Sequence, residues 1–243
     1  SLLIGSPDTH NGGWTGTLYQ GAVYHFEFNG TVWKETQRFM TDDGGQFQNF
    51  GKVMARSGDY AIFGDPESEI NGNISQGAIY IFEDQDTAWV QVQKLSVPEG
   101  HAFSFFGRKL DIENELIAAS GEMNDELTVY VIEKGASDWQ ISGTICPEKQ
   151  QENMSFGNTL KIQWPYLFVG ALLYDYGNAI NMGGVFVFEN LAVDTWKEKL
   201  ILTPELKRAG SLFSSSIDFN GATILVGANN ALHGGAIYFF EQQ

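Results

Sequence analysis

Apolar and polar positions follow two short-range patterns along this chain, and both are typical of β-strands. In one pattern four or five apolar residues stand in a row, and in the other apolar and polar residues alternate. A continuous apolar run of that length indicates a strand covered on both faces, whereas alternation indicates a strand with one covered face. No long window has the 3.6-residue spacing of an amphipathic helix. The hydropathy pattern therefore predicts an all-β chain.

The strands recur in a fixed order. A complete repeat has Phe-Gly, a short mixed strand A, an apolar strand B ending in Gly, an alternating strand C, and a more polar strand D that starts near a Trp. The predicted ranges are 52–55, 109–112, 159–162 and 215–219 for A; 2–4, 60–63, 116–119, 167–169 and 224–226 for B; 22–28, 78–83, 128–133, 185–189 and 236–241 for C; and 32–39, 88–95, 139–145 and 196–202 for D. Repeat boundaries fall near residues 50, 106, 156 and 213, a period of roughly 50–57 residues.

A period of that length, built from four short antiparallel strands, predicts a β-propeller whose blades are the repeats. Strands B and C occur five times and strands A and D four times. We expect a single domain over residues 1–243 with five blades, and the alternative is a piece of a larger propeller that has been cut at both ends. With 43% hydrophobic and 14% aromatic residues, the chain has ample material for a core.

The motifs of these repeats resemble those of the FG-GAP family, and most closely its bacterial-type variant. The resemblance covers essentially the whole chain. It rests on Phe50-Gly51, Phe106-Gly107 and Phe156-Gly157, and on Gly21-Ala22-Val23-Tyr24, Gly77-Ala78-Ile79-Tyr80 and Gly235-Ala236-Ile237-Tyr238. The fifth repeat departs from the motif, with Phe213-Ser214 in place of Phe-Gly. The resemblance implies a β-propeller used for binding and adhesion, as in the heads of integrin α-chains, and not a catalytic fold.

Integrin-like members of the family hold calcium in the loop between strands A and B. The corresponding loops here are Arg56–Asp59, Asp111–Glu115, Gln163–Pro165 and Asp218–Gly221. None of them offers three oxygen ligands at alternate positions closed by Gly, whereas calcium needs six to eight oxygen contacts. We therefore expect no metal site, and no sequence signal indicates a cofactor.

Charge and cysteine content limit the classes of partner. The formal net charge is −16, so the surface repels phosphate groups and we expect binding neither to nucleic acid nor to an anionic membrane. No apolar stretch approaches the length of a membrane span, so we expect no membrane insertion. Cys146 is the one cysteine, and we expect it to be a small packed side chain and not a nucleophile.

Three long loops between strands B and C are the candidate binding elements. They run from Gly5 to Gly21, Gly64 to Gly77 and Gly170 to Gly183, and they combine carboxylates, amides and aromatic residues outside the repeat pattern. In a four-stranded meander the B–C loops and the D–A crossovers leave the sheet at the same end, and such loops are where binding usually resides. The candidate binding residues are Asp8, Trp14, Tyr19, Asp65, Glu67, Tyr174, Asp175 and Tyr176.

The main hypothesis is a non-catalytic, extracellular or cell-surface module for adhesion or assembly, which binds a protein partner or a second copy through these loops. The alternative is a lectin that uses the same aromatic residues for sugars. A third hypothesis, a glycosidase-like enzyme, needs converging carboxylates such as Asp111 and Asp218, but no ring of carboxylates is apparent and we expect no catalytic site. The Trp residues that start strands D, and the Phe of each Phe-Gly, are predicted to be core residues.

Overall fold

The structure is a computed structural model that describes residues 1–9, 20–41, 48–86, 88–123, 126–192, 195–231 and 234–241. It has two compact units, and each is described by itself below. The first comprises residues 1–110, 121–125 and 135–139, and the second comprises residues 111–120, 126–134 and 140–243. The part of the chain that the structure describes has no α-helix, and so no helix of the length and hydrophobicity needed to cross a membrane.

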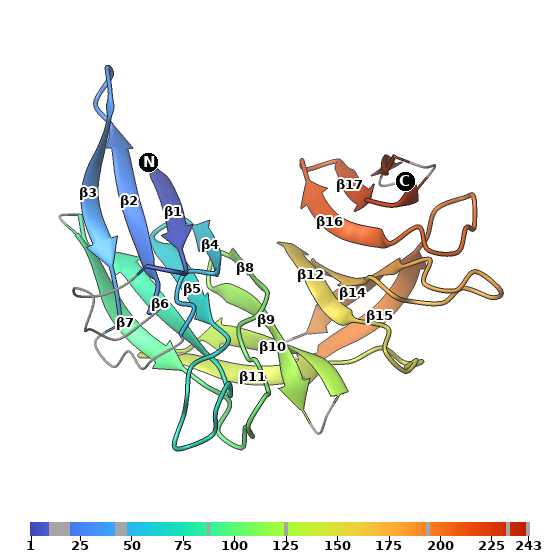
Figure 1. The fold of residues 1–243 in the computed structure, drawn as a ribbon, viewed down its shortest axis with the longest axis horizontal. Helices are drawn as coiled ribbons and strands as arrows, with labels where there is room; N and C mark the ends of the chain where they lie inside the picture. Colours follow the sequence, from blue (N-terminus) through green and yellow to red (C-terminus); the bar gives the residue numbers. More distant parts are fainter. Residues whose placement is uncertain are drawn as a thin grey trace. The chain divides into compact units, whose positions relative to one another are not determined.

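Five antiparallel sheets follow one another along the chain, in the colour order of Figure 1. Their strands are β1 (Leu2–Ser6), β2 (Ala22–Phe28) and β3 (Trp33–Phe39); β4 (Val53–Ser57), β5 (Tyr60–Asp65), β6 (Ala78–Asp84) and β7 (Trp89–Leu95); β8 (Leu110–Glu113), β9 (Leu116–Met123), β10 (Glu126–Lys134) and β11 (Trp139–Ile145); β12 (Phe156–Gln163), β13 (Tyr166–Ala171), β14 (Gly184–Ala192) and β15 (Thr195–Leu202); and β16 (Phe213–Phe219), β17 (Thr223–Ala228) and β18 (Ala236–Glu241).

Each sheet is a meander in which strands pair in sequence order, which is the topology of a propeller blade. The three middle sheets have four strands, in the predicted order A to D. The first sheet has strands B, C and D, and the last has strands A, B and C. The predicted all-β propeller fold is confirmed. The predicted strand count is also confirmed, with strands B and C in five sheets and strands A and D in four among the described residues.

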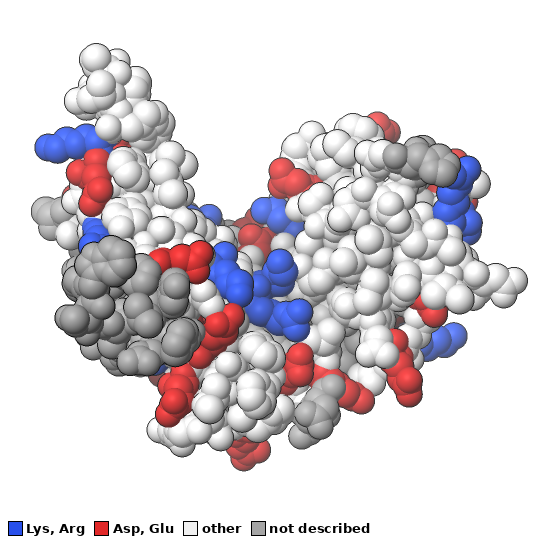
Figure 2. Space-filling view, viewed as in Figure 1, with Lys and Arg blue, Asp and Glu red and all other residues white. Residues whose placement is uncertain are grey.

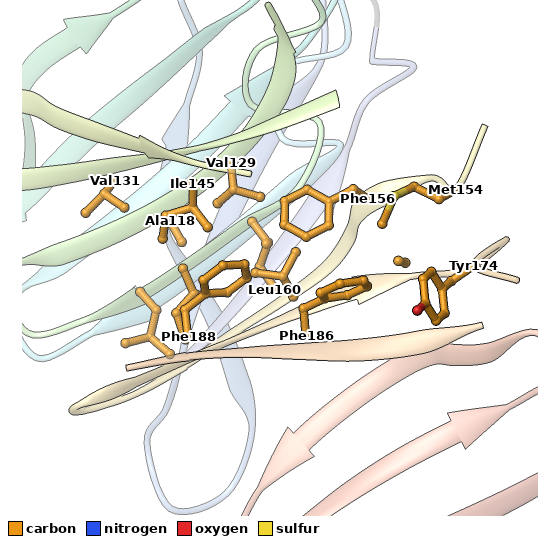
Figure 3. Close-up of a cluster of buried hydrophobic side chains, with 14 of the residues drawn as sticks. Ala118, Val129, Val131, Ile145, Met154, Phe156, Leu160, Tyr174, Phe186 and Phe188 are labelled. Atoms are coloured by element: carbon orange, nitrogen blue, oxygen red, sulfur yellow. The ribbon is translucent and has the colours of Figure 1, made fainter. Parts of the chain in front are cut away.

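Aromatic and β-branched side chains fill the space between consecutive sheets. In the first unit Phe50, Phe63 and Tyr80 are buried together, and the Phe50 ring meets the Tyr80 ring edge-on at 5.2 Å between centroids. In the second unit Phe156 and Phe186 form the equivalent pair at 5.6 Å, shown in Figure 3. The Phe residues of the Phe-Gly motifs are thus core residues, as predicted.

The Gly that precedes strand C makes a close contact between consecutive repeats. Gly77 pairs with Phe106 of the next repeat, and Gly183 pairs with Phe213 in the same way. A Cβ on Gly77 would lie 2.3 Å from the carbonyl oxygen of Phe106, and one on Gly183 would lie 2.0 Å from that of Phe213. Since no side chain fits in this space, the Gly-Ala and Phe-Gly motifs of neighbouring repeats are two halves of one contact.

The Trp that begins strand D packs against the preceding sheet. Trp89 is 4% exposed, and the side-chain amide of Gln37 bonds to both its backbone nitrogen (2.9 Å) and its backbone oxygen (2.7 Å). Gln93 holds the backbone of Trp139 with the same two bonds. The prediction that these residues are core is therefore confirmed for Trp89 and Trp139, but Trp33 in the first sheet is 52% exposed.

The prediction that Cys146 is a packed side chain is wrong, because this cysteine is exposed. It directly follows Ile145, the last residue of β11, whose side chain is buried. Successive side chains of an extended segment point in opposite directions, so Cys146 faces outward.

Candidate functional site

The loops between strands B and C in the second and fourth sheets have equal length and the same backbone structure. In the second sheet Gly77 donates a backbone hydrogen bond to Ser68 (3.0 Å), and in the fourth sheet Gly183 donates one to Tyr174 (2.9 Å). These bonds close the base of each loop at the start of strand C. The two loops are therefore repeats of one element, although their sequences share few residues.

The tip of each loop is a two-residue hairpin. Ile70 and Asn73 exchange backbone hydrogen bonds of 3.2 and 2.9 Å, and Tyr176 and Ala179 exchange bonds of 3.2 and 3.1 Å. The chain can reverse within two residues because the first of them has a positive φ, which is 60° at Gly177.

An exposed isoleucine follows each hairpin. Ile74 is 57% exposed and Ile180 is 61% exposed. The D–A crossover of the same sheet fixes both backbones, since Phe103 donates to the Ile74 carbonyl (2.9 Å) and Gly210 donates to the Ile180 carbonyl (2.8 Å). Each loop thus presents a large apolar side chain on a backbone that is held in place.

Additional bonds hold the loop of the fourth sheet. The side-chain amide of Gln151 donates to the Asp175 carbonyl (2.9 Å) and accepts from the Asp175 N–H (2.8 Å). The Asp175 carboxylate accepts a bond of 2.6 Å from the backbone of Asn181. Asp175 therefore shapes the loop from within, on both sides of the hairpin.

Tyr176 lies at the tip of this loop and is 45% exposed. The ammonium group of Lys207 lies 4.6 Å from the centre of its ring, a cation–π contact. Leu206, next to Lys207 in the crossover, is 53% exposed. We call Tyr176, Ile180, Leu206 and Lys207 the Tyr176 surface.

The structure separates the predicted binding residues into several environments. Tyr174 is only 9% exposed and its ring packs against Phe186 at 5.2 Å, so it belongs to the core of its unit. Glu67 forms a 3.1 Å ion pair with Lys52, and Asp8 is exposed. Trp14 and Tyr19 lie outside the described residues. Of the predicted residues of the fourth-sheet loop, Tyr174 is buried, Asp175 is partly buried, and only Tyr176 is exposed.

Asp65 is completely buried at the end of β5. Loss of hydration raises its pKa to about 7, although the bond that its Oδ1 accepts from the Asn49 backbone (3.1 Å) partly opposes this shift. Its carboxyl group supports the junction between the loop and strand A, and it has no surface to offer a ligand.

The carboxylates considered for glycoside hydrolysis have separate partners. Asp111 accepts a 2.6 Å bond from the backbone of Ile162 and lies 3.7 Å from the ammonium group of Lys161. Burial raises the pKa of Asp111. Asp218 accepts a bond from the backbone of Phe219. No group of three or more His, Cys, Asp or Glu side chains that could hold a metal ion occurs among the described residues.

A cavity between the fourth and fifth sheets has no counterpart in the sequence-based predictions. Its volume is about 840 Å³, and Tyr166, Phe168, Val187, Leu200, Phe219 and Phe240 are among the side chains that line it. Lys199 also borders the cavity, where it donates to Tyr166 (3.1 Å) and pairs with Glu189 (3.0 Å). The sequence indicated this cavity only through the strand count, because strand D is predicted four times and strand C five times.

Five consecutive antiparallel meanders define a β-propeller protein, and a Gly–Phe contact joins the first sheet to the second, the second to the third and the fourth to the fifth. Sequence comparison places an FG-GAP repeat at residues 33–82, a segment that contains both Phe50-Gly51 and Gly77-Ala78. The chain is a β-propeller protein that contains an FG-GAP repeat. Propellers built from FG-GAP repeats are typically non-enzymatic, and the fold fits a module for binding or assembly.

Comparison with solved structures gives one match that shares the fold, at low sequence identity, and a weaker second match. A protein from Lactobacillus plantarum matches with a TM-score of 0.55 and 15% identity, over 98% of this chain and 65% of that one. TolB from Acinetobacter baumannii matches with a TM-score of 0.43 and 13% identity, over 92% of this chain and 49% of TolB. The chain thus spans less than two thirds of either protein. No curated protein sequence matches it.

Proposed function

We propose that this propeller is a non-catalytic binding or assembly module, and that its B–C loops contact a protein partner. The observation that supports this proposal is the Tyr176 surface, where Tyr176 and Ile180 remain exposed on a loop whose backbone is fixed by hydrogen bonds. A rigid aromatic side chain beside aliphatic groups and a cation is the composition of a binding hot spot. Little conformational entropy is lost when such a loop is covered.

The second-sheet loop supports the same proposal independently. Ile74 and Phe103 are each 57% exposed, and a backbone bond of 2.9 Å joins the two residues. Two loops of the same backbone structure therefore each present apolar side chains. An extracellular or cell-surface location belongs to the same proposal, and the strongly acidic composition supports it.

The test is cross-linking mass spectrometry on native material, compared with a Tyr176→Ala/Ile180→Ala double variant. We expect a reproducible protein partner cross-linked near residues 172–183, and loss of roughly tenfold or more in its yield in the double variant. A Val90→Ala/Val92→Ala variant is the matched control, because these β7 side chains are 41% and 42% exposed outside the loops. Unchanged cross-links in the loop variant would contradict the assignment.

The same variants test the lectin alternative. A sugar can stack on an exposed aromatic ring, and the Tyr176 ring is the exposed one in this loop. The lectin alternative predicts glycan binding that free monosaccharide blocks and that Tyr176→Ala abolishes. This result, without any protein cross-link, would identify the ligand as a carbohydrate and not a protein.

A further inference from the structure

Three tripeptides of this chain match the acceptor pattern for N-linked glycosylation, which is Asn, any residue except Pro, and then Ser or Thr. They are Asn29-Gly30-Thr31, Asn73-Ile74-Ser75 and Asn153-Met154-Ser155. The pattern alone does not distinguish an acceptor from an Asn that the fold uses for its own contacts. The structure does so, because it places the three Asn side chains in different environments.

The first tripeptide forms the turn at the tip of the hairpin of β2 and β3 (Figure 1), and its three residues are exposed. Gln85 and Asp86 occupy the corresponding turn of the second sheet and are exposed as well. That sheet has bonds to both the first and the third sheet. Exposure therefore belongs to this kind of turn, wherever its sheet stands in the chain.

The turn holds one end of the Asn29 side-chain amide and leaves the other end free. The Oδ1 atom accepts hydrogen bonds of 3.0 Å from the backbone N–H groups of Thr31 and Val32, which is an Asx turn. The Nδ2 atom has no hydrogen-bond partner among the described residues. Because the bonded residues are at most three apart in sequence, the turn can form before the rest of the sheet.

Asn73 uses its amide nitrogen within the fold. Its Nδ2 donates to Oε1 of Gln76 (2.9 Å) and to the carbonyl oxygen of Gly100 (3.2 Å). A glycosylated Nδ2 retains a single hydrogen, so a glycan at Asn73 would break one of these bonds and leave its acceptor without that donor. The second tripeptide therefore matches the acceptor pattern in sequence, but the fold occupies its amide.

The fold also accounts for Asn153, in the third tripeptide. Asn153 has a φ of 58°, and the equivalent residues Phe103 and Gly210, each three positions before the Phe that opens a repeat, have φ values of 64° and 69°. The backbone thus requires a positive φ at this position, and Asn adopts it more readily than most residues. The next residue, Met154, is 5% exposed and belongs to the core.

We propose that Asn29 carries an N-linked glycan. Its Nδ2 attacks C1 of an oligosaccharide that is linked to a lipid diphosphate, so the N–C1 bond forms and the bond from C1 to the diphosphate oxygen breaks. The lipid diphosphate leaves, and the Nδ2 proton passes to a base of the transferase. The two bonds to Oδ1 withdraw electron density from the amide and favour loss of this proton, and Thr31 supplies the hydroxyl of the acceptor pattern.

This proposal rests on the extracellular location that belongs to the proposed function, because such acceptors occur in surface loops of secreted proteins. A glycan at Asn29 is compatible with binding by the B–C loops. The seven-residue strand β2 begins at Ala22, directly after the B–C loop of its sheet, and ends at Phe28, directly before Asn29. The turn and that loop are therefore at opposite ends of one strand, about 20 Å apart.

The experiment is digestion of the native protein with peptide-N-glycosidase in water enriched in the heavy oxygen isotope, followed by peptide mass spectrometry. The glycosidase converts a glycosylated Asn to Asp and labels it with heavy oxygen. We expect the label at Asn29 in most copies and no label at Asn73. A digest without the glycosidase corrects for spontaneous deamidation at Asn29-Gly30. Unlabelled Asn29, or equal labelling of Asn29 and Asn73, overturns the proposal.

Variants made in the cells that produce the native protein test the acceptor directly. Thr31→Ala keeps the backbone bonds to Asn29 but removes the hydroxyl, so we expect loss of the glycan mass, whereas Thr31→Ser retains it. Asn73→Gln is the matched control and leaves the glycan mass unchanged. A glycan that persists in Thr31→Ala overturns the assignment. Unmodified Asn29 together with a partner cross-linked near residues 172–183 would reject this proposal alone and leave the proposed function in place.

Discussion

Ser214 stands where the other repeats have the Gly of Phe-Gly, and it adopts the same backbone conformation. Its φ is 81°, compared with 79° at Gly51 and 86° at Gly107. The conformation is retained because the Ser214 carbonyl accepts bonds from Thr159 (2.9 Å) and Asn158 (3.3 Å). A side chain in this region costs about 1–2 kcal/mol relative to glycine.

We therefore expect Ser214→Gly to raise the free energy of unfolding by about 1 kcal/mol, because it relieves this strain and leaves the carbonyl in place. Urea denaturation measures the change. Ser216→Gly is the matched control, since Ser216 lies within the regular part of β16 and its substitution is expected to destabilise by roughly 0.5–1 kcal/mol. Destabilisation by both substitutions would show that the Ser214 backbone is not strained.

Asp65 gives the fold a dependence on pH. Its pKa is about 7 in the folded protein and 3.8 in the unfolded chain. The folded state therefore holds the proton more tightly, so this stabilisation is fully present below pH 3.8 and is lost as the pH rises through about 7. About three pKa units correspond to about 4 kcal/mol.

An Asp65→Asn variant keeps an Oδ1 acceptor for the Asn49 N–H but carries no charge. Between pH 4 and pH 8 we expect the wild-type protein to lose about 4 kcal/mol of stability relative to this variant. Urea denaturation across this range measures the difference, and Asp8→Asn is the control at an exposed carboxylate. A difference that stays constant with pH would show that Asp65 is not buried as an acid.

At the scale of elements, the contact between Gly77 and Phe106 predicts that replacing this glycine by alanine costs more stability than the same replacement at a glycine without such a contact. Gly77→Ala places a Cβ 2.3 Å from the Phe106 oxygen and 2.4 Å from its nitrogen, at a φ of 87°. We expect a loss of about 3 kcal/mol or more in urea denaturation, since both the strand start and the Phe-Gly turn must shift.

Gly235 is the matched position in the last sheet. Its φ is 89°, but the nearest atom to an added Cβ is 3.4 Å away. Gly235→Ala is therefore expected to cost only the backbone strain of about 1–2 kcal/mol. Equal losses of stability for the two variants would mean that the close contact between Gly77 and Phe106 does not add to the cost of the substitution.

Strand order could be predicted because each strand has its own pattern and the Gly motifs mark its end. The predicted bounds of β2, β11 and β18 are those observed. The prediction for β9 stopped at Ala119, whereas the strand continues to Met123. Ser120 and Gly121 resemble a strand end in sequence, but Ser120 is completely buried within the sheet.

The candidate site could be predicted only in part, since side-chain direction within a loop depends on its turns. Tyr174 and Tyr176 are two residues apart and would point the same way in an extended strand. The hairpin that begins at Tyr176 reverses the chain, so Tyr174 faces the core and Tyr176 faces outward. Asp65 looked like a loop residue beside Pro66, but it is the last residue of β5.

For the whole molecule, the net charge of −16 does not come from one acidic site. Figure 2 shows carboxylates and cations interspersed on the visible face. Among the described residues, ion pairs such as Arg108–Glu122 (3.5 Å) and Lys134–Glu115 (3.4 Å) join opposite charges. Exposed pairs of this kind add little stability. We expect the charge to act mainly as a general repulsion of anionic partners.

The pairing of Gly77 with Phe106 has an evolutionary consequence. A stretch of chain that runs from one Phe-Gly to the next contains the Phe of one junction and the Gly of the following junction. When such a stretch is duplicated in tandem, every new boundary again joins a Gly to a Phe-Gly turn. Gene duplication can therefore lengthen this array one repeat at a time without requiring a new interface.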